Sequence, residues 1–522
     1  MKWPWWRRTS RPIRRRVYAG ARQSNLEWNW LASLLSSNQE IAASLKMLRA
    51  RSRQLARDNP YMVSFLNLLR TNVVGSNGIR LQSHIVDANG KPRDFFNRSI
   101  EIGWKSWGRK GTCTADGRMT WRDVQALAIV TEAVDGEYII YHRPGFRNRF
   151  QYAVQFIDPD RLDITFNRPA NIRKGENRVV MGVEVDADTR PIAYWFTDQH
   201  PAEVGESRRR SRVDAQFIEH GYLVQRSDQY RGVPWAAPIL LSLNMFDGYT
   251  EAELVAARSS ASKPLFYEQD AESVDANEDT DAELVDEIAP GYVGLLPAGV
   301  TPHQMDPQHP NGAFEQFQKA ILRGVASGLG VSYSAMTGDL RDVNFSSIRT
   351  GLLQERDIWR SLQRHHIDNL ADPVMRKWLQ FAVAADQVTL PSRDHERWAD
   401  AQTWKPRGWA WVDPVKDVMA AEAGIALGTT TRTAVCDALG VDFEDNMDQL
   451  RREQDLADAK GVDISGLKLA AIEGANNGGQ GQDGPAVSGG NGRGRADAGD
   501  GDGGRIGLGE YRVQFGDTGR ED

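Results

Sequence analysis

Two long helical segments separated by an insertion of different character constrain this chain most. The first is expected over 233–262, with Pro234 in its first turn, and the second over 312–331. Residues 263–311 between them contain two short strand-like stretches, an acidic run and several prolines. Each helix would be about 30 Å or more in length. The pattern therefore predicts a small β-containing insertion at the far end of two helical arms.

A polar segment follows the second arm. Residues 332–347 are rich in Ser, Gly, Asp and Asn but include two large apolar residues, Met336 and Phe345. Another long helix begins near residue 348, so a flexible segment joins two helices. A hinge, a catalytic loop and a loop that contacts a passing molecule are all compatible with this composition.

The rest of the chain predicts a mainly helical α+β protein. Helices broken at Pro60 are expected between 39 and 71, and further helices over 93–107 and 121–134. Strands are expected over 79–86, 137–143, 151–157, 178–185 and 192–197. The expected parts are a basic arm (1–38), an α+β part (39–232), a long returning helix (348–405), a helical part (406–470) and a disordered Gly/Asp-rich tail (471–522).

Composition excludes several classes of protein. A chain of 522 residues is too long for one core, so two to four structural units are expected. The net charge of −6 argues against a protein that wraps nucleic acid on a basic face. Two cysteines, Cys113 and Cys436, suit a reducing compartment. No apolar run approaches the roughly 20 residues that a membrane span needs.

Catalytic patterns are absent from the sequence. It contains no phosphate-binding P-loop and no cysteine pair with zinc spacing. His365 and His366 are adjacent, so on a helix they point about 100° apart and cannot share a metal; an exposed helix surface is expected there. Asp158 and Asp160 are expected in a turn after a strand. We therefore predict no catalytic residue, no metal site and no cofactor.

Several short segments, taken in order, resemble the portal proteins of tailed bacteriophages in the lambda-like family. They include DNPY at 58–61, NVVG at 72–75, DGE at 135–137, FIDPDRL at 156–162, QYRGVPW at 229–235, EAELVAAR at 251–258 and the segment 328–363. The resemblance covers roughly residues 40–400. It implies a homo-oligomeric ring, usually a dodecamer, at one capsid vertex, through which double-stranded DNA is packaged and ejected.

The resemblance also implies an architecture and partners. The α+β part would be the wing, the two arms the stem, the insertion a clip, residues 332–347 a channel (tunnel) loop and 406–470 a crown. The partners would be the terminase large subunit, head–tail adaptor or neck proteins, and major capsid and scaffold proteins, without a membrane. The protein would lie in the virion, and in the host cytoplasm during assembly.

Residues of the stem and loop are assigned to the channel on this basis. Asp247 and Glu251 would present an acidic face that repels DNA phosphates and lets the duplex slide. Lys319, Arg341 and Asn344 would make transient contacts, and Met336 belongs to the same loop. An ion pair of Arg341 with a neighbouring subunit is an equally good interpretation.

The second arm carries an apolar stripe that predicts a contact between subunits. It comprises Phe314, Phe317, Ile321 and Val325 at helical spacing, and a ring interface is its expected destination. Two alternatives to a portal remain open at this point. One is a metal-dependent, nuclease-like enzyme that uses scattered carboxylates, and the other is a scaffold unrelated to viruses.

Overall fold

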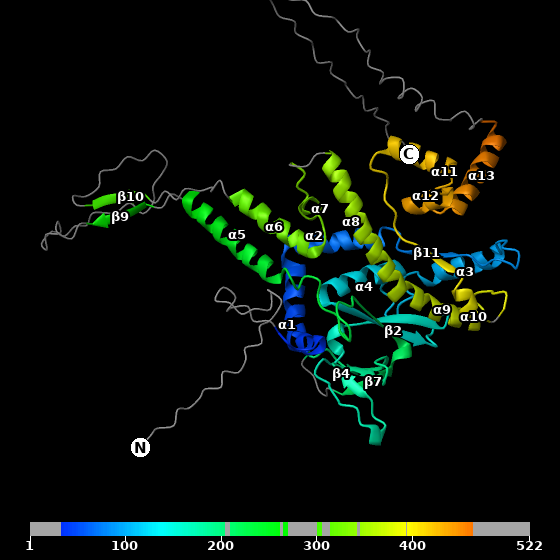
Figure 1. The fold of residues 1–522 in the computed structure, drawn as a ribbon, viewed down its shortest axis with the longest axis horizontal. Helices are drawn as coiled ribbons and strands as arrows, with labels where there is room; N and C mark the ends of the chain where they lie inside the picture. Colours follow the sequence, from blue (N-terminus) through cyan, green and yellow to red (C-terminus); the bar gives the residue numbers. More distant parts are fainter. Residues whose placement is uncertain are drawn as a thin grey trace, which may run out of the picture. The chain divides into compact units, whose positions relative to one another are not determined.

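The computed structural model describes residues 33–203, 209–261, 265–269, 300–304, 314–341, 345–392 and 394–462 (Figure 1). Most of the predicted basic arm, most of the insertion and all of the Gly/Asp-rich tail lie outside these residues. The chain divides into two compact units, Met1–Glu453 and Gln454–Asp522. All of the elements discussed below for fold and function lie in the first unit, apart from the end of the last helix.

The first helices are set by their caps and by one proline. Helix α1 (Ser37–Asp58) begins with a capping box between Ser36 and Gln39. Asn59 separates it from α2 (Pro60–Leu69), because the Asn59 side chain accepts hydrogen bonds from the backbone N–H groups of Tyr61 and Met62 and so caps α2. The predicted break at Pro60 is thus present. α2 continues into a π-helical turn, η2 (Arg70–Val74).

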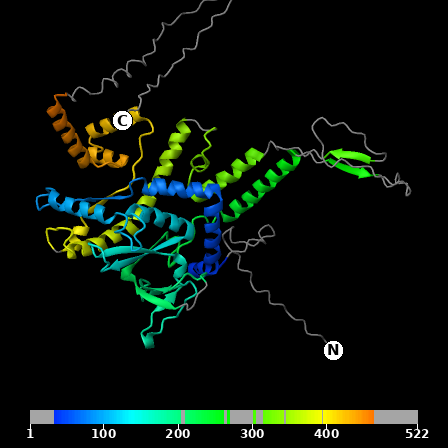
Figure 2. The ribbon, with the colours of Figure 1, turned by 180° about the vertical axis from the view of Figure 1, so that it is seen from behind.

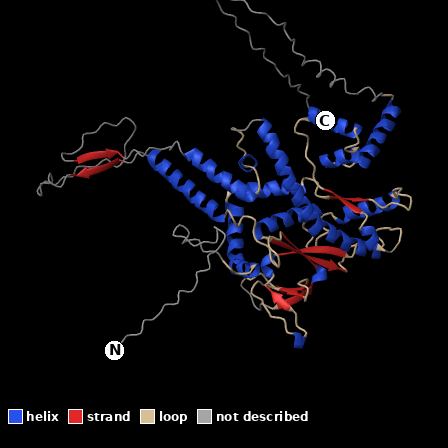
Figure 3. Cartoon of the chain, viewed as in Figure 1, coloured by secondary structure: helices blue, strands red, loops and turns tan. Residues whose placement is uncertain are grey.

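Two small antiparallel sheets are formed by strands between residues 137 and 222. β2 (Glu137–Pro144) lies between β3 (Tyr152–Ile157) and β8 (Ile218–Tyr222). The second sheet has the order β4 (Arg178–Val180), β5 (Val183–Val185), β6 (Pro191–Thr197) and β7 (Arg210–Asp214). Figure 3 shows how these strands are grouped among the helices.

The prediction of one strand over 178–185 is wrong. Met181 and Gly182 both have positive φ, +48° and +84°, and form a two-residue turn that folds β4 back on β5. Such a turn matches the twist of a tight hairpin. The apolar run of this segment hid the turn, because a methionine at positive φ carries no sequence signal.

A tryptophan-rich core joins distant parts of the chain. It lies between α3 (Asp94–Trp107), α4 (Trp121–Asp135) and α9 (Asp372–Ala384). The ring of Trp104 stacks on that of Trp107, with 4.8 Å between the ring centroids, and contacts the ring of Trp378 edge-on, with 5.1 Å between the centroids. β1 (Arg80–Ser83) pairs with β11 (Gln402–Lys405) beside the same core, so two segments that are far apart in the sequence meet there. Trp104 and Trp107 of α3 are therefore core residues, whereas Phe95 on the same helix is 69% exposed.

The two predicted arms are helices α5 (Leu240–Ala261) and α6 (Phe314–Leu329), which lie side by side in Figures 1 and 2. α5 begins later than predicted, because Pro238 lacks an N–H group and restricts Ala237, so residues 235–239 form turns instead. In the chain between the arms, β9 (Leu265–Gln269) pairs antiparallel with β10 (Val300–Gln304). The expected strand near 291–296 lies outside the described residues.

Helices dominate the remainder of the chain. They are α7 (Tyr333–Thr337), α8 (Phe345–His366), the π-helical turn η7 (Ile367–Ala371), α9, α10 (His395–Ala399), α11 (Pro414–Ala426), α12 (Arg432–Leu439) and α13 (Phe443–Lys460). With the sheets above, the fold is mainly helical α+β, as predicted. None of the helices in the described residues is long and apolar enough to span a membrane.

The expectation of an exposed surface at His365 and His366 is wrong. His366 is fully buried, and His365 contacts the buried Glu132 through Nε2 at 2.8 Å. Burial, reinforced by the neighbouring His365, lowers the pKa of His366 to about 3, so this ring is neutral in the folded chain. The helix end is covered by other elements, among them Glu132 of α4 and Tyr138 of β2, which its local sequence does not reveal.

Candidate channel and subunit-contact surface

Aromatic contacts hold the two arms together. The ring of Tyr249 on α5 lies 5.9 Å from that of Phe314 and 5.1 Å from that of Phe317 on α6. Phe317 nevertheless keeps 47% of its side-chain area exposed. Two of the four predicted interface residues thus pack on their own chain, and Phe317 also presents area to the outside.

The other two predicted interface residues lie deeper. Val325 is 1% exposed and belongs to a core that includes Leu243 and Phe246 of α5, and Ile321 is partly buried against that core. Val325 is therefore not on the surface that a neighbouring subunit would contact in this conformation. The apolar stripe of α6 largely serves the contact with α5, because two adjacent helices need such a seam themselves.

α5 exposes several large apolar side chains that the sequence analysis missed. Its exposed apolar side chains are Leu241 (70%), Met245 (65%), Leu254 (63%) and Val255 (56%). Leu241 and Met245 are four residues apart and so share one face of the helix. This four-residue spacing is the signal in the sequence that could have predicted the exposed apolar pair. Together with Phe317, these side chains provide apolar area that is open to a partner.

The predicted acidic residues of the channel lie on the same helix. Asp247 and Glu251 are both exposed, four residues apart on α5. Asp247 accepts two hydrogen bonds from the Asn59 amide, at 2.8 and 3.0 Å. Asn59 thus caps α2 with its oxygen and binds α5 with its nitrogen. One acidic residue of the pair is therefore fixed against the wing, and Glu251 lies one turn further along.

The predicted channel loop is more ordered than expected over its described part. Residues 333–337 form helix α7, which is capped by the Ser332 hydroxyl. The Met336 side chain is 2% exposed, and its carbonyl accepts a hydrogen bond of 2.8 Å from Ser64 on α2. Ser332 also donates to Glu355 on α8. An apolar side chain in a polar segment was thus a sign of anchoring rather than of mobility.

Basic residues beside this helix take part in a charge network. Asp339 lies 3.2 Å from Arg341 Nε and 4.0 Å from Lys319 Nζ, and Glu315 lies 3.3 Å from Arg341 and 3.2 Å from Lys319. The Arg341 backbone N–H and guanidinium hold the pKa of Asp339 below its usual range. Arg341 is still 71% exposed, whereas Lys319 is 17% exposed. Asn344 lies outside the described residues.

A buried ionic cluster fixes the segment that leads into α5. Glu137 is completely buried, and its carboxylate accepts hydrogen bonds from Arg231 at 2.6 Å, Arg49 at 2.7 Å and the Gly232 N–H at 2.8 Å. His220 lies 3.1 Å away. Burial raises the pKa of Glu137, but the charges of Arg231 and Arg49 outweigh it and hold the pKa well below its usual range.

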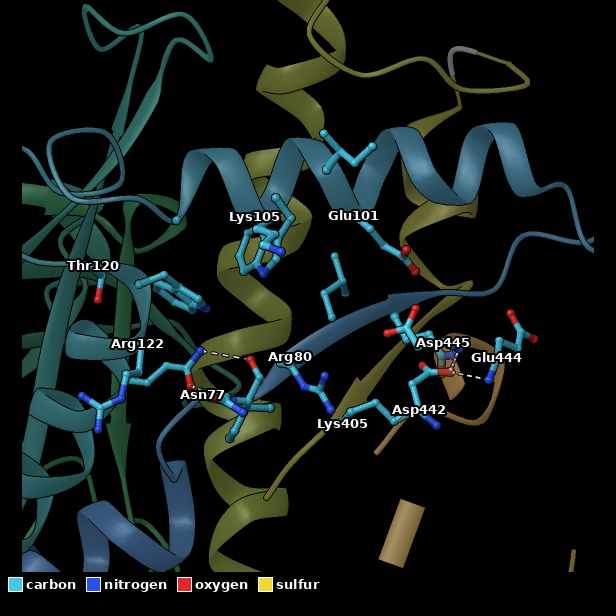
Figure 4. Close-up of a pocket in the computed structure, with 18 residues that line it drawn as sticks. Asn77, Arg80, Glu101, Lys105, Thr120, Arg122, Lys405, Asp442, Glu444 and Asp445 are labelled. Atoms are coloured by element: carbon cyan, nitrogen blue, oxygen red, sulfur yellow. Dashed lines mark hydrogen bonds between the residues drawn. The ribbon is translucent and has the colours of Figure 1, made fainter. Parts of the chain in front are cut away.

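A cavity lies elsewhere, between α3, β1 and the segment that begins α13. It has a volume of about 640 Å³ and is lined by charges of both signs. Figure 4 shows Glu101 of α3 near Asp442 and Asp445, with Arg80 and Lys405 beside them. None of the described residues that line it is a histidine, a cysteine or a serine. Its lining therefore offers no serine or cysteine nucleophile paired with a histidine base.

One acidic group has the spacing of metal ligands. Oxygen or nitrogen atoms of Asp158, Asp160 and His200 lie within 4.8 Å of one another. Arg53 contacts Asp160 at 2.5 Å and Asp158 at 3.2 Å, and Arg49 contacts Asp160 at 3.1 Å. Arginine charges thus already neutralise both carboxylates, which explains their proximity without a cation.

The family model for phage portal proteins of the lambda family matches residues 23–363. A "Probable portal protein" of Halomonas phage phiHAP-1 is 34% identical over 453 residues, which cover 85% of this chain and 87% of that one. The portal protein of Escherichia phage N15 and portal protein B of Escherichia phage lambda are each 22% identical, covering 85% and 81% of this chain and 90% and 86% of theirs.

Solved structures of a gene transfer agent (GTA) particle give weaker matches. The neck of the empty particle, computed with C6 symmetry, has a TM-score of 0.45 and 14% identity, covering 75% of this chain and 93% of that one. The neck of the native particle, computed with C12 symmetry, has a TM-score of 0.41 and 15% identity, with the same coverage. TM-scores of this size are too low to support an argument.

The match over 23–363 and the relative at 34% identity agree with each other and with the resemblance in the sequence. The chain therefore belongs to the lambda family of phage portal proteins. Its function is that of a phage portal, and nothing in the comparisons favours the nuclease alternative.

Proposed function

We propose that identical copies of this chain form a closed ring, a dodecamer, at one vertex of the capsid. The ring provides a channel for packaging and ejection of double-stranded DNA, and its role is structural rather than catalytic. The observation that carries this proposal is membership of the portal family over most of the chain. The exposed apolar side chains of α5 support it, because each subunit of a ring contacts its neighbours through heterologous interfaces that need such area.

The parts of the chain have roles in this proposal. Residues 39–232 form the wing, α5 and α6 the stem, 263–311 the clip, 332–347 the channel loop and 406–470 the crown. Terminase large subunit docks at the clip during packaging, and head–tail adaptor or neck proteins dock there afterwards. Major capsid and scaffold proteins surround the ring. Assembly takes place in the host cytoplasm, and the protein then remains in the virion.

We assign Asp247 and Glu251 to the channel wall. Both are exposed acidic residues on the stem helix that also carries the apolar contact face. Tight neutralisation of phosphates makes DNA binding strong, whereas a conduit requires sliding. An acidic wall prevents such binding, and the exposed Arg341, which pairs with Asp339 and Glu315 within the chain, makes only transient contacts with DNA.

Negative-stain imaging of the purified full chain with native mass determination tests the ring. We expect a closed ring with an axial opening wide enough for duplex DNA. A monomer or dimer at all protein and salt concentrations would contradict the proposal. For the channel wall, the double variant Asp247→Lys and Glu251→Lys should still form rings but slow DNA packaging. Unchanged packaging by such rings would remove both residues from the channel.

A further inference from the structure

Six basic side chains project from two loops of the wing and from the strand end beside one of them. The loop between α3 and α4 carries Arg109, Lys110 and Arg118. Arg143 lies near the end of β2, and the connection from β2 to β3 carries Arg147 and Arg149. All six are exposed, and we call them the wing basic patch. None of them lies on α5, α6 or α7, which form the candidate channel surface.

Hydrogen bonds hold the two loops next to each other. The Asn148 amide nitrogen donates to the Thr112 carbonyl at 2.9 Å and to the Tyr152 carbonyl at 2.8 Å. The Ala115 N–H donates to the Val154 carbonyl at 2.9 Å, so the first loop is also tied to β3. The two groups of basic residues therefore belong to one ordered surface, although they are far apart in the sequence.

The charge of this patch is not balanced within the described part of the chain. None of its six side chains forms an ion pair with a described carboxylate within 4.0 Å. Arg149 contacts the Ser106 hydroxyl and the Phe150 ring, and Arg143 contacts the Tyr141 ring. Arg118 interacts with a carboxylate, because its charge helps to lower the pKa of Asp116.

Asp116 is the one acidic residue in loops 108–120 and 143–151, and its carboxylate accepts the Arg118 backbone N–H. Six positive charges thus face one negative charge, in a chain whose net charge is −6. Exposed cations that outnumber the nearby carboxylates create a local positive potential that attracts anions.

Apolar area is missing from the same surface. No large apolar side chain is exposed in the described stretches 103–126 and 128–203, which include both loops. A stable contact with a protein partner is usually built around a buried apolar or aromatic centre. The wing basic patch has only charge to offer, so it suits a partner with dense negative charge of its own.

We propose that the wing basic patch binds the phosphate backbone of duplex DNA without reading its sequence. Duplex DNA presents closely spaced phosphates, and five of the six side chains are arginines, whose planar guanidinium groups match phosphate geometry. This surface is a second DNA contact, separate from the channel wall, which is acidic. Weak, salt-sensitive binding here allows the wing to hold DNA without obstructing movement through the channel.

Fluorescence anisotropy of a labelled short duplex with the purified full chain, measured over a range of salt concentrations, tests this proposal. The triple variant Arg109→Glu, Lys110→Glu and Arg147→Glu changes three patch residues whose side chains make no described contact. The matched control Lys46→Glu, Arg51→Glu and Arg57→Glu makes the same charge change on exposed residues of α1.

We expect the patch variant to bind at least about tenfold more weakly, with a salt slope smaller by about 2.7, because each lost phosphate contact removes about 0.9. The control should bind like the unchanged chain. Equal losses in both variants would mean that total charge, not this surface, governs binding and would overturn the proposal. Equal binding by all three proteins would overturn it too.

Two competitors separate DNA from other anions. Inorganic phosphate at matched ionic strength should not displace the duplex, and a polyglutamate peptide of similar total charge should displace it poorly. If polyglutamate competes better than unlabelled duplex, the patch is a docking surface for an acidic protein and the proposal is wrong. Ring formation is measured separately on the same variants, so a failure here leaves the ring proposal intact.

Discussion

Replacing Glu137 by glutamine should loosen the packing of the segment that leads into α5 against β2 and β8. Glu137 is the acceptor at the centre of a buried cluster, bound by Arg231, Arg49 and the Gly232 N–H. Gly232 lies in the segment that leads to α5. The variant Glu137→Gln keeps the size of the side chain but removes its charge and offers one acceptor oxygen in place of two.

The size of the effect follows from burial. Glu137 and Arg231 are both fully buried, and Arg49 is almost so, so water cannot replace the lost charge. Removing one partner of a buried ion pair costs about 3–5 kcal/mol, because the remaining charge is left uncompensated. Arg231 keeps hydrogen bonds to the carbonyls of Leu162 and Met181. These do not supply a negative charge, so a loss of about 3 kcal/mol or more is expected.

Hydrogen–deuterium exchange of the folded chain measures this locally. At about 1.4 kcal/mol per tenfold, amides of β2 and β8 should exchange roughly two to three orders of magnitude faster in Glu137→Gln. The control Asp448→Asn breaks the exposed pair with Arg98 and should cost about 0–1 kcal/mol. If Glu137→Gln changes exchange no more than the control does, the cluster does not stabilise this junction and the reasoning is refuted.

The same cluster carries a dependence on pH. The pKa of Glu137 is lower in the folded chain than in the unfolded chain, where it is near 4.3. Its contribution to stability is therefore fully present above that value and is lost as the pH falls through the lowered folded pKa. Glu137→Gln should abolish this part of the acid sensitivity.

Three further substitutions test other parts of the structure. Gly136 has φ +89°, and an added Cβ would lie 2.5 Å from the Val233 carbonyl carbon, so Gly136→Ala should lower the urea concentration at the midpoint of unfolding. Gly145→Ala, where an added Cβ would lie in open space, should lower this midpoint less. Asn59→Ala removes the cap of α2 and the contact with Asp247 and should cost about 1 kcal/mol or more, against little for Asn67→Ala. Burial lowers the pKa of His366 to about 3, whereas the pKa in the unfolded chain is near 6.5, so acidification below 6.5 favours the unfolded chain. His366→Leu should reduce the slope of the unfolding free energy against pH between 6 and 4 by up to about 1.4 kcal/mol per pH unit. An unchanged slope would contradict this.

Much of the fold could be predicted from local patterns. The break at Pro60, the helical spacing of residues 93–107 and the long helix before Leu329 depend on interactions within a few residues, which the sequence displays directly. The ordered set of short motifs identified the family for the same reason, since each motif is local. Local signals failed where backbone conformation was unusual, as at Met181 in the hairpin of β4 and β5.

The candidate site depended more on tertiary packing. An apolar stripe on α6 predicts that a face is covered but does not reveal by what, and Val325 proved to be covered by α5 of its own chain. Met336 and His366 were likewise buried by elements that lie far away in the sequence.

By itself, the sequence determined the helical arms, the α+β class and the portal family, because those rest on local periodicity and on motifs in a fixed order. Only the tertiary structure decided which charged and apolar side chains remain at the surface. The wing basic patch is an example, since its two loops meet through the hydrogen bond from the Asn148 amide nitrogen to the carbonyl of Thr112, 36 residues away. Burial and charge balance depend on every neighbour in space, and the order of residues does not specify those neighbours.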